Sequence, residues 1–278
     1  MTLHPEFVEI VRRALEEDIG SGDITSRACV PEERRAQGRF IAREQLVLAG
    51  IDLLPLIYRL RGGIQSIEVL KRDGAAIESD ETVAVVVGSA RRLLECERVA
   101  LNFLQRLSGI ATLARKFSDA VEGTGCRVLD TRKTTPGLRR LEKMAAKAGG
   151  AVNHRMGLYD AVLIKNNHIA AAGGVRQALE NARVYAPDFP AEIEVRTRAE
   201  LDEALACGAT HLLLDNLTPE EAGQWVRLID GRATVEISGG VTLETARAYA
   251  QTGAHFVSVG AITHSAPAAD LSFRLELL

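Results

Sequence analysis

The sequence predicts an α/β protein whose larger part is a (β/α) barrel, and three observations lead to this prediction. From Arg127 onward, short apolar runs of strand length alternate with segments of helical spacing. Four of these runs, the last of which begins at His255, start about twenty residues apart, the length of one βα unit. Such units close into a barrel or wind an open sheet, and polar residues recurring at the strand ends favour the barrel.

The first ninety residues have a different pattern of helical and strand-like runs and predict a smaller mixed α/β domain. A helix is expected over 5–17, with apolar residues at helical spacing. Runs that are rich in β-branched residues and bounded by glycine predict strands within 38–50, 64–70 and 82–88. The stretch 91–123 keeps apolar residues at helical spacing throughout and predicts one or two helices that join the domains.

The barrel part follows in regular order. Strands are expected over 127–130, 161–165, 191–195, 211–215, 234–238 and 255–260. Helices are expected over 138–150, 197–208, 218–229 and 242–253.

Composition limits the function classes. The chain has 278 residues, a formal charge of −3 and no run of eighteen uncharged apolar residues, so we expect a soluble protein without a membrane anchor. The four cysteines lie far apart, without a CxxC pair, as is typical of reduced thiols in a cytoplasmic protein. The net acidity argues against a general affinity for nucleic acid.

The charge is nevertheless concentrated in one window. Between Arg127 and His168 there are nine lysines and arginines against three acids, so the window carries +6 and the rest of the chain −9. A local basic site in an acidic protein indicates a small polyanionic ligand.

Each predicted barrel strand ends in a polar or charged residue or in a glycine. These residues are Asp130, Lys165, Glu194, Asp215, Ser238 and Gly260. In a (β/α) barrel the carboxyl ends of the strands meet at one mouth, so we expect these six positions to line one site.

Two of these strand ends suit phosphate. Ser238, Gly239 and Gly240 lie between a strand and a helix, where backbone N–H groups and a helix N-terminus bind anions. Gly260 lets a ligand approach the backbone after the next strand, and His264 follows closely. Phosphate sites in barrels are typically built from the loops after the last two strands.

The loop after the first barrel strand carries Arg132 and Lys133. The guanidinium group of arginine is a planar fork of donors and the ammonium group of lysine is a mobile point charge, so the two residues can bind two different anions. Arg139, Lys143 and Lys147 recur every four residues on the following helix and are interpreted as a solvated face.

The stretch 149–169 adds His154, Arg155, Lys165 and His168. Two histidines among cations, with no third ligand at suitable spacing, make a histidine–metal site a poor interpretation. Anchors for an acidic substrate fit these residues better.

The motifs DTRKTTPGLRRLEK, GGAVNHRMGLYDAVLIKNNHI, LLLDN, SGG and VSVGAITHS, with EEDIGSGDITS near the start, occur in the order and spacing of the quinolinate phosphoribosyltransferase family. The resemblance spans nearly the whole chain. It implies an incomplete (β/α) TIM-like barrel over 110–266, with a smaller mixed α/β N-terminal domain over 1–109 that the C-terminal tail 267–278 joins. It also implies a homodimer in which the N-terminal domain caps the partner's barrel.

The same resemblance implies the activity and the site. The reaction is transfer of phosphoribose from phosphoribosyl pyrophosphate to quinolinate with loss of CO2, which gives nicotinate mononucleotide for NAD synthesis. The catalytic residues would be Lys165, Glu194 and Asp215, with Mg²⁺ held directly or indirectly by the two carboxylates. The implied quinolinate ligands are Arg132, His154, Arg155 and Lys165, with Arg98 from the other subunit. Lys133, Glu194, Asp215, Ser238, Gly239, Gly240, Gly260 and His264 would bind phosphoribosyl pyrophosphate.

Met144, Ala151 and Asn166 depart from the family pattern without replacing an implied ligand. Two alternatives remain open at this stage. One is a related barrel phosphoribosyltransferase that acts on another aromatic acid, such as nicotinate. The other is a nucleic-acid-binding protein that uses the basic window, against which stand the overall acidity and the lack of aromatics among those cations.

Overall fold

The computed structural model describes residues 4–278, which form two compact units. The first unit contains the described residues up to Arg115, together with Thr134–Gly150 and Ile262–Leu278, and the second contains Lys116–Lys133 and Ala151–Ala261. The predicted boundary at residue 109 stays a prediction. Each unit is described by itself below.

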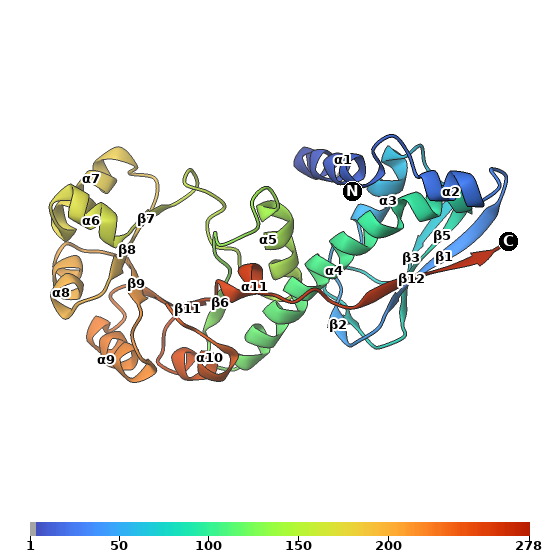
Figure 1. Cartoon of the computed structure of the whole chain (residues 1–278). Helices are drawn as coiled ribbons and strands as arrows, with labels where there is room; N and C mark the ends of the chain where they lie inside the picture. Colours follow the sequence, from blue (N-terminus) through green and yellow to red (C-terminus); the bar gives the residue numbers. More distant parts are fainter. Residues whose placement is uncertain (1–3) are drawn as a thin grey trace. The chain divides into compact units, whose positions relative to one another are not determined.

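The first unit is built on a four-stranded sheet in which all neighbouring strands are antiparallel (Figure 1). Its strands lie in the order β12 (Leu271–Leu277), β1 (Arg35–Ala42), β5 (Thr82–Ser89) and β3 (Ser66–Val69). The short strands β2 (Leu46–Val47) and β4 (Ala76–Ile77) form a separate pair. Phe40 and Phe273 lie opposite each other on β1 and β12, with ring centroids 4.9 Å apart. The C-terminal strand is therefore packed into this sheet through an aromatic cross-strand pair.

Helices α1 (Pro5–Ile19), α2 (Ile24–Cys29), α3 (Leu53–Leu60), α4 (Ala90–Ala120) and α5 (Arg139–Ala148) complete most of this unit. The predicted first helix is confirmed, and its buried residues Phe7, Val11 and Leu15 are spaced by four on one face. The stretch predicted as one or two helices contains one helix, α4, of 31 residues, in which apolar spacing continues through Gly109.

The structure corrects the interpretation of α5 as carrying a solvated basic face. Lys147 is exposed, but the side chain of Lys143 is 1% exposed and Arg139 is half-buried, with its Nε donating to Thr134 Oγ1 at 3.0 Å. Spacing by four places residues on one helix face, but it does not tell whether that face meets solvent or protein. The prediction was therefore wrong for Lys143.

The second unit is an open, parallel, six-stranded sheet, which confirms the predicted incomplete barrel. The strands lie in the order β6 (Arg127–Leu129), β11 (Phe256–Ser258), β10 (Thr234–Ser238), β9 (His211–Asp215), β8 (Ala191–Val195) and β7 (Val162–Ile164). A single parallel bridge from Leu129 to Val152 extends the sheet beyond β6, and no described strand pairs β6 with β7. The barrel is thus left open beside β7.

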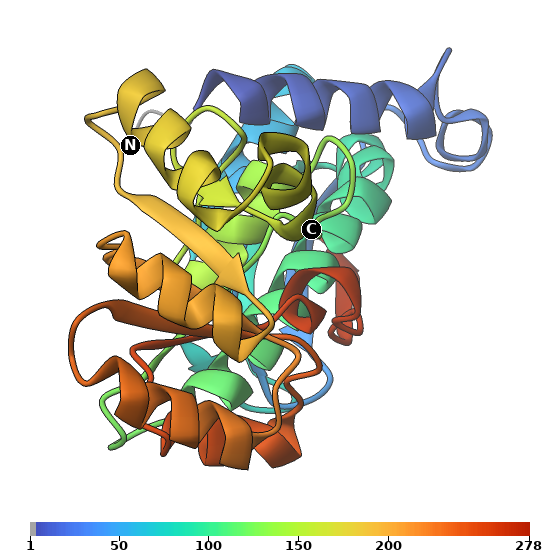
Figure 2. The same ribbon diagram turned by 90° about the vertical axis from the view of Figure 1, so that its left-hand side faces the viewer.

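Five helices lie on the outer, convex side of this sheet (Figure 1). They are α6 (Asn166–Ala172), α7 (Val175–Tyr185), α8 (Arg198–Ala206), α9 (Pro219–Ile229) and α10 (Leu243–Ala250). Figure 2 shows them ranged in chain order, from yellow to red. The short helix α11 (Ala261–His264) follows β11. Among residues 4–278, no helix is long and apolar enough to span a membrane.

Candidate active site

A cavity of about 430 Å³ lies at the carboxyl ends of the strands of the second unit. Ten of the residues predicted from the sequence line it: Arg132, Lys133, His154, Arg155, Lys165, Glu194, Asp215, Ser238, Gly239 and Gly240. All belong to the second unit. Parallel strands bring them together because successive βα units place their carboxyl ends on the same edge of the sheet.

Cations dominate one part of the cavity lining. Arg132 and Lys133 come from the loop after β6, Arg155 from the loop before β7, and Lys165 from the residue after β7. Burial and the positive charge of Arg132 lower the pKa of Arg155, which shows that the two guanidinium groups repel each other electrostatically. The Nη1 of Arg155 donates to the carbonyl of Ala161 at 3.2 Å, which holds the side chain in place. An anion that binds both guanidinium groups would relieve their repulsion.

Lys165 is an accessible predicted anchor, with a side chain that is 51% exposed. Its Nζ lies 4.0 Å from Glu194 Oε2. Its backbone N–H donates to His168 Nδ1 at 2.9 Å, so His168 fixes the end of β7 and does not line this cavity.

Asp130 does not line the cavity, which corrects the prediction for this strand end. Its side chain is fully buried and accepts hydrogen bonds from Asn153 Nδ2 at 2.6 Å and from the backbone N–H of His154 at 2.8 Å. Asp130 therefore fixes the segment that carries His154 instead of meeting a ligand.

His154 is held by two carboxylates from the inner side of the sheet. Its Nε2 lies 3.4 Å from Glu236 Oε2 and 3.6 Å from Glu192 Oε2, and Ser258 Oγ donates to Glu236. Burial by itself lowers the pKa of His154, but hydrogen bonds and charge from both glutamates outweigh it and raise the pKa to about 9. The raised pKa favours the charged form of His154. Its Nδ1 accepts a hydrogen bond from the backbone N–H of Arg155 at 2.6 Å, so both ring nitrogens have partners within the protein.

The surroundings of His154 also correct the sequence interpretation of them as purely cationic. Glu192 and Glu236 bring two carboxylate oxygens within reach of the imidazole, although neither is near His154 in the sequence. Burial raises the pKa of Glu192, while its hydrogen bond with His154 opposes this shift.

A pH prediction follows from this cluster. The folded-state pKa of His154 lies above its ordinary value of 6.5, so its contribution to stability is complete below about pH 6.5 and is lost as the pH rises through about 9. The positive charge that His154 contributes to anion binding should be lost over the same rise in pH, through about 9. We expect the KM for the acidic substrate to rise above pH 9 in the wild type, and at lower pH in Glu236→Gln. Equal pH profiles for the two proteins would contradict the role of Glu236.

Glu194 and Asp215 occupy neighbouring strands and lie on either side of Arg196. An Arg196 Nη2 atom lies 2.8 Å from Glu194 Oε1 and 3.0 Å from Asp215 Oδ2, and Arg196 Nε donates to Asp215 at 3.1 Å. Both carboxylates are largely buried, with side-chain exposures of 5% and 12%, whereas that of Arg196 is 44%. One exposed guanidinium group therefore lies against two largely buried carboxylate groups.

The loop Ser238–Gly240 closes the cavity on the side of β10. Gly239 has a φ of +101°, and a Cβ there would lie 2.3 Å from Asn216 Oδ1. Both conditions require glycine, and they leave the loop backbone accessible to a ligand. Asn216 itself has a φ of +58°, a conformation that asparagine tolerates better than most residues.

Three predicted ligands lie elsewhere. Arg98 is exposed on α4 of the first unit, and His264 is exposed at the end of α11, where its Nδ1 lies 2.5 Å from Ser265 Oγ. Gly260 follows β11 in the second unit but is not among the residues that line the cavity.

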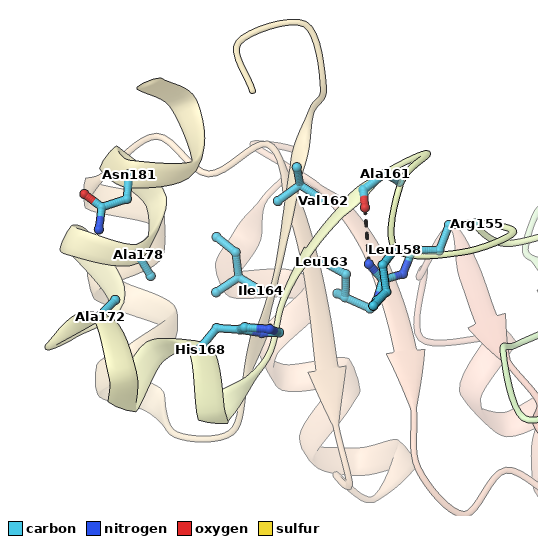
Figure 3. A pocket seen from close by; sticks show the side chains of 10 residues that line it. All are labelled: Arg155, Leu158, Ala161, Val162, Leu163, Ile164, His168, Ala172, Ala178 and Asn181. Atoms are coloured by element: carbon cyan, nitrogen blue, oxygen red, sulfur yellow. Dashed lines mark hydrogen bonds between the residues drawn. The ribbon is translucent and has the colours of Figure 1, made fainter. Parts of the chain in front are cut away.

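A second cavity, of about 400 Å³, lies between the edge strand β7 and helices α6 and α7 (Figure 3). Its lining is mostly aliphatic and includes Val162, Leu163 and Ile164. Arg155 and Leu163 line both cavities, and Figure 3 shows the hydrogen bond from Arg155 to Ala161. This cavity therefore lies beside the open edge of the sheet.

Sequence reasoning missed Glu192, Arg196, Asn216, Glu236 and Ser258. Strand alternation carries a signal for two of them, because Glu192 and Glu236 stand two residues before Glu194 and Ser238 and so share their face of the sheet. Arg196 follows the last residue of β8 directly, the same position that marked Lys165 after β7, and this signal was overlooked.

The fold and the cavity define a barrel protein whose mouth suits a small polyanion, with cations, buried carboxylates and a glycine loop for phosphate. Two family models match the chain: the N-terminal domain of quinolinate phosphoribosyl transferase over residues 23–108 and its C-terminal domain over 110–274. The chain therefore belongs to the quinolinate phosphoribosyltransferase family, as the sequence motifs predicted.

Relatives agree with this assignment over their full length. The nicotinate-nucleotide pyrophosphorylase (carboxylating) of Mycobacterium leprae is 43% identical over 273 residues, which cover 96% of each chain. The crystal structure of NadC from Streptococcus pyogenes has a TM-score of 0.95 at 38% identity and covers 100% of this chain and 99% of its own. The nicotinate-nucleotide pyrophosphorylase of Francisella tularensis has a TM-score of 0.93 at 34% identity, with 99% and 98% covered.

Proposed function

We propose that this chain transfers the phosphoribosyl group of phosphoribosyl pyrophosphate to quinolinate and releases pyrophosphate and CO2, giving nicotinate mononucleotide for NAD synthesis. The family membership and the full-length similarity to carboxylating pyrophosphorylases support it. One structural observation supports the proposed function most strongly. A single cavity of about 430 Å³ combines several cations with two buried carboxylates and a glycine loop, as one dicarboxylate and one pyrophosphate ester require.

Arg132, His154, Arg155 and Lys165 are proposed to bind quinolinate. Arginine forks suit carboxylates in bidentate geometry, and the raised pKa of His154 favours its charged form beside them. The mutual repulsion of Arg132 and Arg155 makes binding of a dianion more favourable than in a neutral site.

Phosphoribosyl pyrophosphate is proposed to bind at Lys133, Glu194, Asp215 and the Ser238–Gly240 loop. Glu194 Oε1 is buried and receives no hydrogen bond among residues 4–278, although Arg196 lies at ion-pair distance. Together with Asp215 on the adjoining strand it offers oxygen ligands of the kind that Mg²⁺ prefers. When bound, Mg²⁺ would neutralise charge on the pyrophosphate.

In the proposed reaction the ring nitrogen of quinolinate attacks C1 of the ribose and pyrophosphate leaves. Glu194 and Asp215 stabilise the positive charge that develops on the ribose, or hold its hydroxyl groups. The 2-carboxylate then departs from the quaternised ring as CO2, and a proton takes its place on the ring carbon. Lys165 stabilises the electron density left on the ring carbon through electrostatics, not through a covalent intermediate.

Arg98, Gly260 and His264 remain proposed ligands, with Arg98 supplied by the partner in a homodimer. A cytoplasmic location likewise stays a proposal.

Subunit complementation tests the shared site. Arg98→Ala and Lys165→Ala should each abolish activity alone, because each removes a charge-assisted contact to substrate. Mixing the two variants should restore part of the activity, since a heterodimer would contain one intact site. A lack of recovery in verified heterodimers would contradict the shared site.

The function itself is tested with quinolinate, phosphoribosyl pyrophosphate and Mg²⁺, with nicotinate mononucleotide as the expected product. Quinolinate labelled at the 2-carboxylate should release labelled CO2 in equal amount. Turnover of nicotinate in place of quinolinate would favour the related transferase, and binding of nucleic acid at physiological salt would favour the basic-window alternative.

A further inference from the structure

Arg196 is the one residue of the cavity that pairs with both buried carboxylates, among the contacts described for residues 4–278. The guanidinium spans Glu194 Oε1, at 2.8 Å, and Asp215 Oδ2, at 3.0 Å. Lys165 is more distant, at 4.0 Å from Glu194. Arg196 therefore supplies the main positive charge between the two acids.

Hydrogen bonds fix the main chain of Arg196 and the side chain of Asp215. Arg196 N–H donates to Glu200 Oε2 at 2.7 Å, and the same carboxylate caps α8 through the N–H of Thr197 at 3.1 Å. Glu194 and Asp215 lie on the paired strands β8 and β9, and Asn216 Nδ2 holds Asp215 Oδ2 at 2.8 Å. The acids and the main chain of Arg196 are thus fixed, while its long side chain reaches the acids from the cavity mouth.

The pairing is incomplete, which distinguishes it from a permanent structural bridge. Glu194 Oε1 is buried, yet the nearby Nη2 of Arg196 does not approach it with hydrogen-bond geometry. A buried carboxylate oxygen without a hydrogen bond is costly, so a better partner is favoured there. With 44% of its side chain exposed, Arg196 can leave without disturbing the core.

We propose that Arg196 is the resident counter-ion of the Glu194–Asp215 pair in the substrate-free site and that an incoming divalent cation displaces it. A divalent cation accepts both carboxylates as ligands, whereas a guanidinium cannot coordinate a metal and occupies the same space. The displaced side chain would stay attached to the cavity lining, which also includes the Ser238–Gly240 loop. This inference rests on the proposed assignment of the two carboxylates to the cation.

The test measures Mn²⁺ binding to the substrate-free protein from the loss of the free-ion electron paramagnetic resonance signal. Arg196→Gln should bind Mn²⁺ about tenfold more tightly than the wild type, because the cation no longer competes with a guanidinium. Arg196→Lys should fall between the two, since lysine keeps the charge but lacks the planar fork.

Arg198→Gln is the matched control. Arg198 lies two residues away, carries the same charge and is similarly exposed, but it pairs with Asp202 on its own helix at 2.9 Å. A general change in protein charge would raise Mn²⁺ affinity equally in both variants, whereas displacement predicts a change within twofold for Arg198→Gln. Thermal melts of all variants verify that each is folded.

Equal effects of the two substitutions, or an unchanged or weakened affinity in Arg196→Gln, would overturn the proposal, as would the lack of Mn²⁺ binding in every variant. Product formation from quinolinate is measured on the same preparations. An active enzyme with unaltered Mn²⁺ affinity in Arg196→Gln would refute the counter-ion role alone, while an inactive wild type would refute the proposed function.

Discussion

Replacing Arg155 by alanine should lower kcat/KM for quinolinate by roughly 10²-fold or more, because a charge-assisted contact to substrate contributes a few kcal/mol. The loss should concern quinolinate more than phosphoribosyl pyrophosphate, since Arg155 lies with Arg132 in the cationic part of the cavity lining. Steady-state kinetics with each substrate varied in turn measures the effect. Arg155→Lys keeps the charge without the bidentate fork and should recover only part of the activity.

Arg176→Ala provides the comparison for this prediction. Arg176 belongs to the same unit, but its side chain is 59% exposed and pairs only loosely with Glu180, at 3.9 Å. Its removal should leave kcat/KM unchanged. Near-wild-type kcat/KM in a folded Arg155→Ala protein would refute the assigned role.

Replacing Arg106 by alanine should lower the free energy of unfolding by about 3–5 kcal/mol, the usual effect of leaving a buried charge without its partner. Arg106 Nη2 and Nε donate to Glu142 Oε1 at 2.8 and 3.1 Å, and the Glu142 side chain is fully buried. Glu142 also accepts from the N–H and Oγ1 of Thr135, at 3.0 and 2.7 Å. Arg106 further donates to the carbonyls of Thr263 and Ala266, so one side chain joins the three segments of the first unit.

Urea unfolding followed by circular dichroism measures this effect. Arg12→Ala serves as control, because Arg12 pairs with Glu9 on the surface, where both side chains are 49% exposed, and its loss should cost at most about 1 kcal/mol. Arg106→Met combined with Glu142→Leu removes both charges and should be more stable than Arg106→Ala. A loss of less than about 1 kcal/mol in Arg106→Ala would show that Glu142 is adequately stabilised by Thr135 alone.

The barrel strands and helices α8, α9 and α10 were predictable because their signals are local, whereas α2, α3, α6, α7 and α11 were not predicted. Alternation of apolar strands and amphipathic helices marks every strand from β6 to β11, and α8 and α9 begin at a threonine followed three residues later by the glutamate of a capping box. The cavity lining was largely predictable too, because parallel strands oblige residues at their carboxyl ends to converge. Ten of the thirteen predicted site residues line one cavity for this reason.

Side-chain environment was much less predictable. Asp130 ends its strand as Glu194 and Asp215 do, yet it is buried and holds the segment of His154. Lys143 shares its helical spacing with the exposed Lys147 but is buried. Burial depends on what packs against an element, and that partner is distant in the sequence.

The sequence by itself determined the family and the α/β architecture and placed Arg132 and Lys133 in the loop after a barrel strand, since these depend on motifs and local periodicity. Only the tertiary structure decided that Glu192 and Glu236 raise the pKa of His154, and that Arg196 lies between Glu194 and Asp215. Charge state and ion pairing depend on distances of a few ångströms between strands that are about twenty residues apart in the chain, and only the folded sheet sets those distances.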